Sequence, residues 1–161
     1  MDALLSLFDE ARATIAALGI NQWQNGYPSR EVVESDIERG ESYVYVEDGE
    51  IVATFAMLRD VEPTYKKIYD GVWLSGDTEC YVAVHRFAIA LRKRGCGIAS
   101  RIFDFVEGVA TDAGKPSIRI DTHEGNVVMR RMLQKNGFLH CGTIFLENGD
   151  ARVAYEKNLN T

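Results

Sequence analysis

The sequence lacks several features that would place a protein in a class at once. Its cysteines, Cys80, Cys96 and Cys141, are odd in number and show neither a CxxC pair nor metal-ligand spacing, which argues against a disulfide framework and a zinc site. No apolar run reaches the ~18 residues that span a membrane. No repeat, low-complexity tract or long linker interrupts the chain. We therefore expect reduced thiols, no bound metal and no membrane partner.

Positive charge is also scarce. The chain has 18 Lys and Arg against 24 Asp and Glu, a formal net charge of -6, which argues against a nucleic-acid surface. Its first residues carry Asp2, Asp9 and Glu10 where a secretion signal has cations, so we expect a cytoplasmic protein. With 46% hydrophobic residues in a length of 161, we expect one globular domain over residues 1–161.

The first part of the chain predicts two helices and a hairpin. Apolar residues at helical spacing indicate a helix over residues 2–18, with Asp2 as N-cap. Ser29 can cap a second, short helix that ends at Gly40. Two β-rich runs around Asp48-Gly49 then predict a β-hairpin. The segment 62–73 that follows is ambiguous, and we interpret it as a short helix within a loop region.

The second part predicts a parallel strand pair. A strand over residues 81–90 precedes an amphipathic helix and a strand over 117–123, an order that makes a right-handed crossover between parallel strands. A helix from Asn126 and a terminal hairpin around Asn148-Gly149 follow. The fold class expected is therefore α/β, with a mixed sheet and a central parallel pair. The crossover helix should bury one face made of Ile98, Ile102, Phe105, Val106, Val109 and Ala110.

The junction between that strand and its helix holds the most informative stretch, RKRGCGIAS. Three cations, Arg92 to Arg94, stand directly before Gly95 and Gly97. A helix start offers unpaired backbone N–H groups and a positive dipole end, and glycine permits close approach, so this is a place for a phosphate. A solvated charge run is the alternative interpretation.

Three kinds of phosphate site use glycines at such a junction. The GxxxxGK pattern of a P-loop is absent. A dinucleotide fingerprint would combine Gly95, Gly97 and Ser100 with Asp121 as the ribose acid. That pattern fits poorly, because Ser100 replaces the third small Gly or Ala and the unit begins past the middle of a short chain.

The third kind rests on a family resemblance. R-G-C-G-I-A, residues 94–99, resembles the [Q/R]-x-x-G-x-[G/A] loop of the GNAT N-acetyltransferase superfamily, and the order of helices and hairpins is similar over nearly the whole chain. The resemblance implies a single GNAT-like domain whose central parallel strands splay apart, flanked by helices. It also implies acetyl-CoA as the cofactor and, because dimers are common in such proteins, a homodimer.

The resemblance further implies how coenzyme A is held. The amides of the loop would bind the pyrophosphate, Arg94 would contact a phosphate, and the first splayed strand would pair with pantetheine as with an extra strand. Asn126 would be a helix N-cap, a cofactor contact, or both. The cofactor residues expected are Phe87, Ala88, Ile89, Arg94, Gly95, Cys96, Gly97, Ile98, Ala99, Ser100 and Asn126.

The implied activity is direct acetyl transfer from acetyl-CoA to a primary amine of a small molecule or peptide. A backbone N–H near Phe87 would stabilise the oxyanion. Many family members carry a tyrosine four residues before the Gly-Phe pair, which would protonate the departing thiolate, but Leu133 stands there. This departure keeps an alternative open: a catalytically silent module that binds or senses coenzyme A.

Three side chains are candidates for moving the proton of the amine. An unperturbed imidazole titrates near neutrality, and His85 lies on the strand that leads into the loop. His123 ends the other strand, and Glu79 could relay a proton through water. A structural role is the alternative for each. Strand alternation places Tyr81, Ala83, His85 and Phe87 on one face, so Tyr81 could orient the imidazole or line the acceptor pocket. By resemblance, Trp23 and Tyr27 would cover that pocket.

Overall fold

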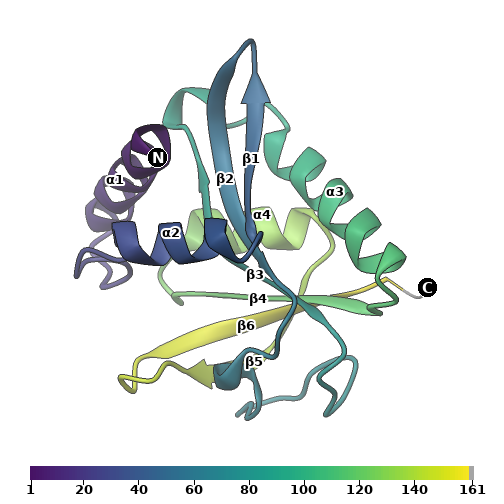
Figure 1. The fold of residues 1–161 in the computed structure, drawn as a ribbon. Helices are drawn as coiled ribbons and strands as arrows, with labels where there is room; N and C mark the ends of the chain where they lie inside the picture. The colour runs from purple at the N-terminus through teal and green to yellow at the C-terminus, as the bar shows by residue number, and fades with distance from the viewer. Residues whose placement is uncertain (160–161) are drawn as a thin grey trace.

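In a computed structural model, the protein is described over residues 1–159. The chain forms one mixed sheet with four helices and two 3-10 turns around it (Figure 1). Within these residues no helix is long and apolar enough to cross a membrane. In chain order the elements are α1 (Asp2–Ala17), α2 (Arg30–Glu38), β1 (Ser42–Glu47), β2 (Glu50–Leu58), η1 (Pro63–Tyr65), β3 (Val82–Ile89), η2 (Leu91–Lys93), α3 (Ile98–Asp112), β4 (Ser117–Thr122), α4 (Val127–Lys135), β5 (Leu139–Phe145) and β6 (Ala151–Asn158).

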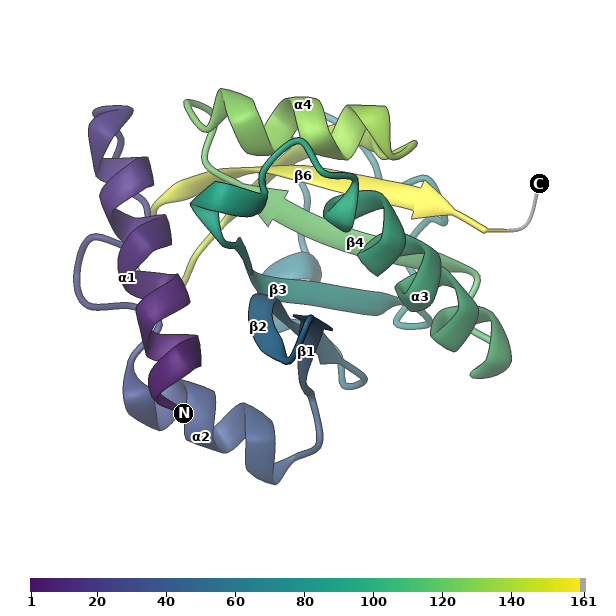
Figure 2. The same ribbon diagram turned by 90° about the horizontal axis from the view of Figure 1, so that it is seen from above.

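The sheet has the strand order β1-β2-β3-β4-β6-β5. Only β3 and β4 run parallel, and every other neighbouring pair is antiparallel. The expected α/β fold with a central parallel pair is therefore confirmed. Both predicted hairpins form, and Asp48 and Gly49 adopt φ values of 52° and 80°, as the two central residues of a type I′ turn require. The helices α1 and α2 lie on one side of the β1–β2 hairpin and α3 on the other (Figures 1 and 2).

The parallel pair splays apart soon after it begins. Strands β3 and β4 pair only at Val82 with Ile118 and at Ala83 with Arg119. Beyond Ala83, no strand in residues 1–159 pairs with the edge of β3 that faces β4, whereas β4 stays paired with β6 over its whole length. The expected splay is confirmed, and it leaves a row of β3 backbone groups without a strand partner.

Apart from the main hydrophobic core of the domain, the structure has a smaller hydrophobic cluster that contains Tyr65, Trp73, Tyr81 and Ala83. In the 59–81 segment that covers it, the short helix expected within a loop region forms only as the three residues of the 3-10 helix η1, and the rest is irregular. Side-chain contacts hold the segment instead: the Trp73 indole N–H donates to the Tyr65 carbonyl at 3.0 Å, and the two rings lie 5.2 Å apart.

A buried ion pair attaches this segment to the sheet. Arg119 Nε and Glu156 Oε2 lie 2.9 Å apart, and their side chains are only 1% and 0% exposed. The guanidinium lies between the rings of Trp73 and Tyr81, 4.2 Å from each ring centre. Ser75 donates to Glu156 through its backbone N–H and its hydroxyl. Burial acts to raise the pKa of Glu156, but the hydrogen bonds it accepts outweigh this and lower that pKa.

Two local expectations about helices were wrong. Asp2 lies in the first turn of α1 and makes no capping hydrogen bond. On α3, Phe103 is buried and Phe105 is 48% exposed, because Phe103 packs on Phe138 at 4.9 Å. The N-cap of α2 is confirmed, since Ser29 Oγ accepts from the Val32 N–H at 3.3 Å.

Candidate functional site

The glycine-loop groove, a hollow of about 340 Å³, lies where β3 gives way to α3. Gly95 and Gly97 have φ values of 76° and 79°, which favour glycine. A Cβ built on either would meet nothing within 4 Å. Gly97 is the N-cap of α3 without a side-chain capping bond, so the first N–H groups of α3 are free of side-chain caps.

The predicted cofactor residues gather in this groove with one exception. Cys96 is exposed, does not line the groove, and directs its thiol toward the Arg94 carbonyl at 3.9 Å. The others all line it: Phe87, Ala88, Ile89, Arg94, Gly95, Gly97, Ile98, Ala99, Ser100 and Asn126.

The three cations before the glycines differ in their partners. Arg92 pairs with Glu50 at 2.6 Å, and Lys93 pairs with Glu47 at 2.5 Å. Arg94 lines the groove and has no ion-pair partner within residues 1–159. Two further cations of the groove come from α4.

These cations, Arg131 and Lys135, were not among the predicted site residues. Their i, i+4 spacing on the helix that Asn126 caps is the signal that could have found them.

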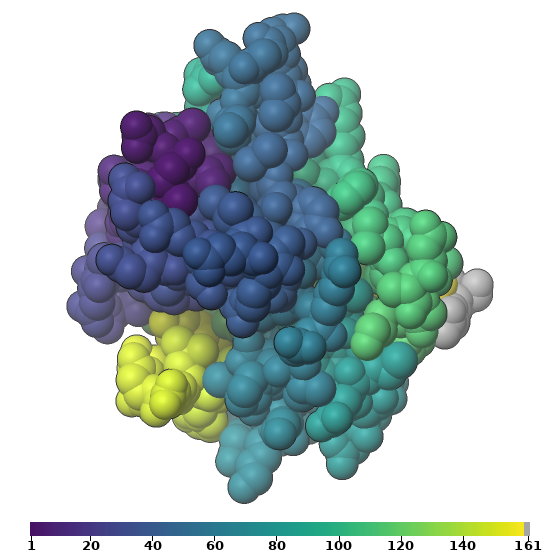
Figure 3. All heavy atoms as spheres, viewed as in Figure 1, coloured from purple at the N-terminus to yellow at the C-terminus, as the bar shows by residue number. Residues whose placement is uncertain are grey.

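The β3–β4 cleft, a second hollow of about 440 Å³, opens between the splayed strands. Its wall also includes the loop that contains Trp23 and Tyr27, and the turn before β6. In Figure 3 that turn and the α1–α2 region, far apart in sequence, lie close together on one face. The cleft and the groove adjoin each other, since they share the wall residues Ile15, Trp23, Phe87, Asn126 and Met129.

A β-bulge in β3 shapes the cleft. The register between β2 and β3 shifts opposite Arg86, which has a φ of 51°. The Arg86 guanidinium donates to both Asp36 oxygens, at 2.6 and 2.7 Å, and to the Tyr27 hydroxyl at 2.8 Å. The bulge is thus held by a bidentate ion pair to α2, and the charge of Arg86 is compensated.

Because of the bulge, the alternation of side chains predicted for this strand is wrong beyond Arg86. Tyr81, Ala83 and His85 share a face, but Phe87 turns to the opposite face and stacks on Phe103 at 5.3 Å with an interplanar angle of 3°. An extra residue in a strand reverses the alternation beyond it. As a result His85 lines the cleft, while Phe87 lies on the wall shared with the groove.

His85 is paired with a partly buried carboxylate. Its Nε2 lies 3.1 Å from Glu62 Oε2, with side chains 17% and 16% exposed, but the two atoms are not aligned for a linear hydrogen bond. The pairing is therefore chiefly electrostatic, and no hydrogen bond within residues 1–159 engages Nδ1. Burial acts to raise the pKa of Glu62, but His85 and the hydrogen bonds from Thr64 outweigh burial and lower that pKa to about 2.

Two tyrosines support this pair. Tyr65 stacks on the His85 ring at 5.8 Å and donates its hydroxyl proton to Asp121 Oδ2 at 2.6 Å. Burial and the Asp121 charge raise the pKa of Tyr65 well above its ordinary value, which keeps the phenol protonated. Tyr81 does not line the cleft; its hydroxyl accepts the Glu62 backbone N–H at 3.0 Å.

The remaining predicted residues fall into two groups. Trp23 and Tyr27 line the cleft, as does Asn126. His123 lines a neighbouring hollow, and its Nδ1 accepts the Gly125 N–H at 2.9 Å. Glu79 is exposed, precedes β3 in the chain, and lines neither the cleft nor the groove.

Asn126 caps α4, as one of the two expected roles requires. Its Oδ1 accepts the Met129 N–H at 3.2 Å, and its Nδ2 donates to Gln22 Oε1 at 3.0 Å. The side chain is therefore fixed in direction where the cleft and the groove meet.

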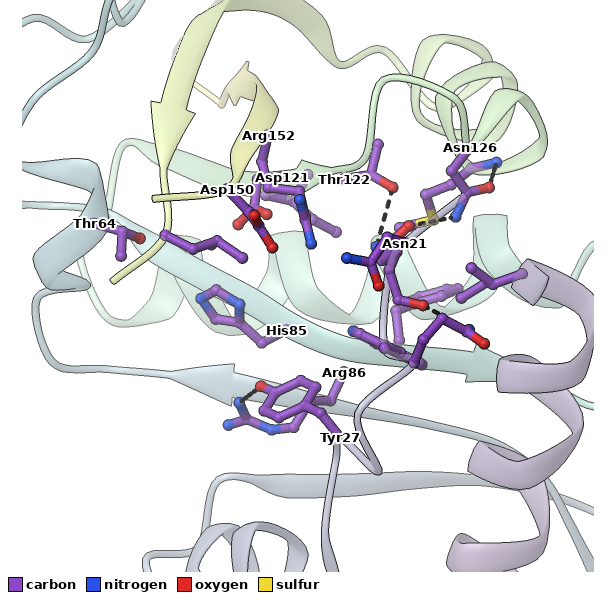
Figure 4. A pocket seen from close by; sticks show the side chains of 18 of the residues that line it. Asn21, Tyr27, Thr64, His85, Arg86, Asp121, Thr122, Asn126, Asp150 and Arg152 are labelled. Atoms are coloured by element: carbon purple, nitrogen blue, oxygen red, sulfur yellow. Dashed lines mark hydrogen bonds between the residues drawn. The ribbon is translucent and has the colours of Figure 1, made fainter. Parts of the chain in front are cut away.

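Several polar residues of the cleft were missed from sequence. Glu62 depends on a segment with no regular pattern, and Arg86 depends on a bulge, so neither had a usable signal. Asp121 was considered only as a ribose acid. Asp150 and Arg152 follow the terminal hairpin turn and line the cleft beside Asp121 (Figure 4); their position next to a predicted turn was the available signal.

Comparison with known proteins identifies the family. Residues 6–138 match the acetyltransferase (GNAT) family, and the chain belongs to it. The family uses acetyl-CoA as the acetyl donor. No curated protein matches the chain with significance.

Among solved structures, a GNAT-family acetyltransferase from Streptococcus agalactiae is 38% identical, with a TM-score of 0.85 over 98% of this chain and 88% of that one. A ribosomal-protein-alanine N-acetyltransferase from Brucella melitensis is 16% identical, with a TM-score of 0.65 over 98% and 93%. A protein from Bacillus anthracis assigned as a streptothricin acetyltransferase, in complex with acetyl coenzyme A, is 18% identical, with a TM-score of 0.56 over 73% and 61%. The last two share the fold.

Proposed function

We propose that this acetyltransferase acts on nitrogen, moving the acetyl group directly from acetyl-CoA to a primary amine of a small molecule or peptide. The observation that carries the proposal is that the two hollows adjoin and share wall residues. Their common wall of Trp23, Phe87 and Asn126 would let a thioester in one hollow meet an amine in the other. Holding both reactants at one point removes much of the entropic barrier to a bimolecular reaction.

The groove fits coenzyme A on three counts. The unpaired edge of β3 offers backbone groups to the amides of pantetheine. The glycine loop leaves open space before the N-terminus of α3, which suits a pyrophosphate. Arg94, Arg131 and Lys135 line the groove and would attract its phosphates. When bound, acetyl-CoA supplies an acetyl thioester.

His85 is the base that we assign. An amine is protonated near neutral pH, so a proton has to leave it before the nitrogen can attack. The Nε2 of His85 lies against Glu62, which favours the tautomer with its proton on Nε2 and its lone pair on Nδ1. That lone pair would accept the proton, and the ionised Glu62 would stabilise the imidazolium formed.

The backbone N–H groups near Phe87 are the donors that we assign to the developing oxyanion, since this part of β3 has no partner on its β4 side. Leu133 offers no hydroxyl and is fully buried in the main core. The thiolate would therefore take its proton from water or from the attacking amine, whose second proton has to leave as well.

The test is incubation with acetyl-CoA and a panel of polyamines, amino acids and peptides, with free thiol as the readout and samples without acceptor as the control. Acceptor-dependent thiol release with a matching mass gain on a nitrogen of the acceptor supports the proposal. Tight binding of acetyl-CoA without acceptor-dependent release would favour a silent coenzyme A-binding module, to which the buried Leu133 points. Transfer to oxygen alone would contradict the proposal.

A further inference from the structure

Arg152 differs from the other buried charged residues of the described chain in having no ion-pair partner. Within residues 1–159, every other charged residue that is buried lies in an ion pair: Asp36 with Arg86, Glu41 with Arg39, and Arg119 with Glu156. Arg152 is only 7% exposed, yet it has no carboxylate partner within 4.0 Å. Its guanidinium therefore forms no ion pair within the described chain, although most of the side chain is buried.

Most hydrogen-bonding capacity of Arg152 is also unused. Its one hydrogen bond within the described residues runs from Nη1 to the carbonyl of Ala151 at 2.8 Å. A guanidinium carries five N–H donors and stays protonated in proteins. A buried arginine keeps a free fork of donors where it receives a planar anion, because two parallel N–H groups match the two oxygens of a carboxylate.

The position of Arg152 points that fork into the β3–β4 cleft. The pairing of Val153 with Thr122 sets Arg152 beside the end of β4, and Arg152 lines the cleft together with His85. In Figure 4, Arg152 and Asp150 lie on one side of His85, and Tyr27 and Arg86 lie on the other.

The cleft also contains carboxylates that form no ion pair with a lysine or arginine of the described chain within 4.0 Å. Glu62 contacts His85, Asp121 accepts from Tyr65, and Asp150 accepts from Asn148 Nδ2 at 3.1 Å. A ligand with both an ammonium group and a carboxylate would match this mixture better than a simple cation, because a cation alone would leave Arg152 without a counter-charge.

We propose that Arg152 binds a carboxylate on the acceptor, and that the acceptor is an amino acid or another small amino-carboxylic acid. This inference rests on the proposed N-acetyltransferase function and narrows its substrate class. A cleft of about 440 Å³ suits a molecule of that size. A peptide N-terminus has no free carboxylate next to its amine, so it lacks the group that Arg152 would recognise.

The experiment compares each standard amino acid, apart from proline, which has no primary amine, and cysteine, which carries its own thiol, with its own α-carboxamide. The amide keeps the amine and loses the negative charge. Release of thiol from acetyl-CoA is measured with the parent protein. We expect kcat/KM for the best amino acid to exceed that of its amide by roughly 100-fold or more, since a site built for a polar group rejects analogues that leave it unpaired.

Variants then assign this preference to Arg152. In Arg152→Met the ratio of acid to amide should fall to within a few-fold of one, with activity on the amide retained. Arg152→Lys should keep part of the ratio, because it preserves the charge and loses the fork. Arg59→Met, which removes an exposed arginine outside the cleft, should leave the ratio unchanged.

The outcomes separate this inference from the proposed function. If polyamines or peptides accept acetyl groups while amino acids do not, or if Arg152→Met retains the preference for acids, the inference is wrong and the function stands. If nothing accepts an acetyl group, the function is wrong. Calorimetric titration of the parent with the same acid and amide pairs, with coenzyme A present, then decides the inference, which fails if the amides bind as tightly as the acids. The same titration decides it if the Arg152 variants do not fold.

Discussion

The buried ion pair of Arg119 and Glu156 attaches the 59–81 segment, which contains Glu62, to the sheet. Its contribution to the free energy of unfolding can be predicted and measured. Glu156→Gln keeps the size and most hydrogen bonds of the side chain but removes its charge, so that it leaves Arg119 buried without a counter-ion. Such a change typically destabilises a protein by about 3–5 kcal/mol. Because both side chains are almost completely buried, at 1% and 0% exposed, water cannot compensate in their place.

Because Arg119 keeps other contacts in the Glu156→Gln variant, we expect its loss of stability to lie at the lower end of that range. The guanidinium keeps two aromatic faces at 4.2 Å and its hydrogen bond to the Gly76 carbonyl at 3.0 Å. We therefore expect a loss of about 3 kcal/mol, which corresponds to roughly 6–12 °C in Tm for a domain of this size. Urea unfolding followed by tryptophan fluorescence at pH 7 measures it.

Two further variants make this prediction refutable. Arg119→Met combined with Glu156→Gln removes both charges and should recover most of the loss, whereas Glu147→Ala, at an exposed glutamate without an ion pair in the described chain, should change stability by less than about 0.5 kcal/mol. The reasoning fails if Glu156→Gln unfolds within about 1 kcal/mol of the parent, or if the double variant is no more stable than the single one.

Three further predictions concern the site. Gly97→Val should raise the Kd for acetyl-CoA tenfold or more, about 1.4 kcal/mol, and Gly49→Val, at a similar φ of 80° outside the groove, should not; equal effects in calorimetry would move the pyrophosphate elsewhere. His85→Gln should lower kcat by ~100-fold to ~10,000-fold and leave acetyl-CoA affinity intact, whereas His140→Gln should change neither kcat nor affinity; turnover within a few-fold of the parent at every pH would make His85 structural. Because the pKa of Glu62 falls from 4.5 to about 2 on folding, its stabilisation is complete above pH 4.5 and lost as the pH falls toward 2; Glu62→Gln should flatten that part of the curve of unfolding free energy against pH, and an unchanged slope would contradict the pairing with His85.

Patterns that are local in sequence predicted most of the fold. Periodicity located the helices, Asp48-Gly49 and Asn148-Gly149 marked both hairpins, and the order strand, helix, strand fixed the parallel pair. The glycine-loop side of the groove was predictable for the same reason, because it is one continuous junction between β3 and α3. Its missed cations, on α4, come from another part of the chain.

The β3–β4 cleft was much less predictable, because its polar residues come together through irregular structure. The bulge at Arg86 depends on an ion pair with Asp36, fifty residues earlier in the chain, and it reverses the side chains beyond it. Glu62 is positioned by a segment that is held by aromatic contacts and a buried ion pair rather than by helical hydrogen bonds. Neither interaction leaves a periodic signal.

The shared wall of the two hollows also has a consequence for inhibitor design. A single molecule that joins an amine-side group to coenzyme A through a short linker would occupy the groove and the cleft at once, passing Trp23, Phe87 and Asn126. Its second half would bind at an effective concentration in the millimolar range or above. Such a conjugate would therefore bind more tightly than either half, even where the amine alone binds weakly.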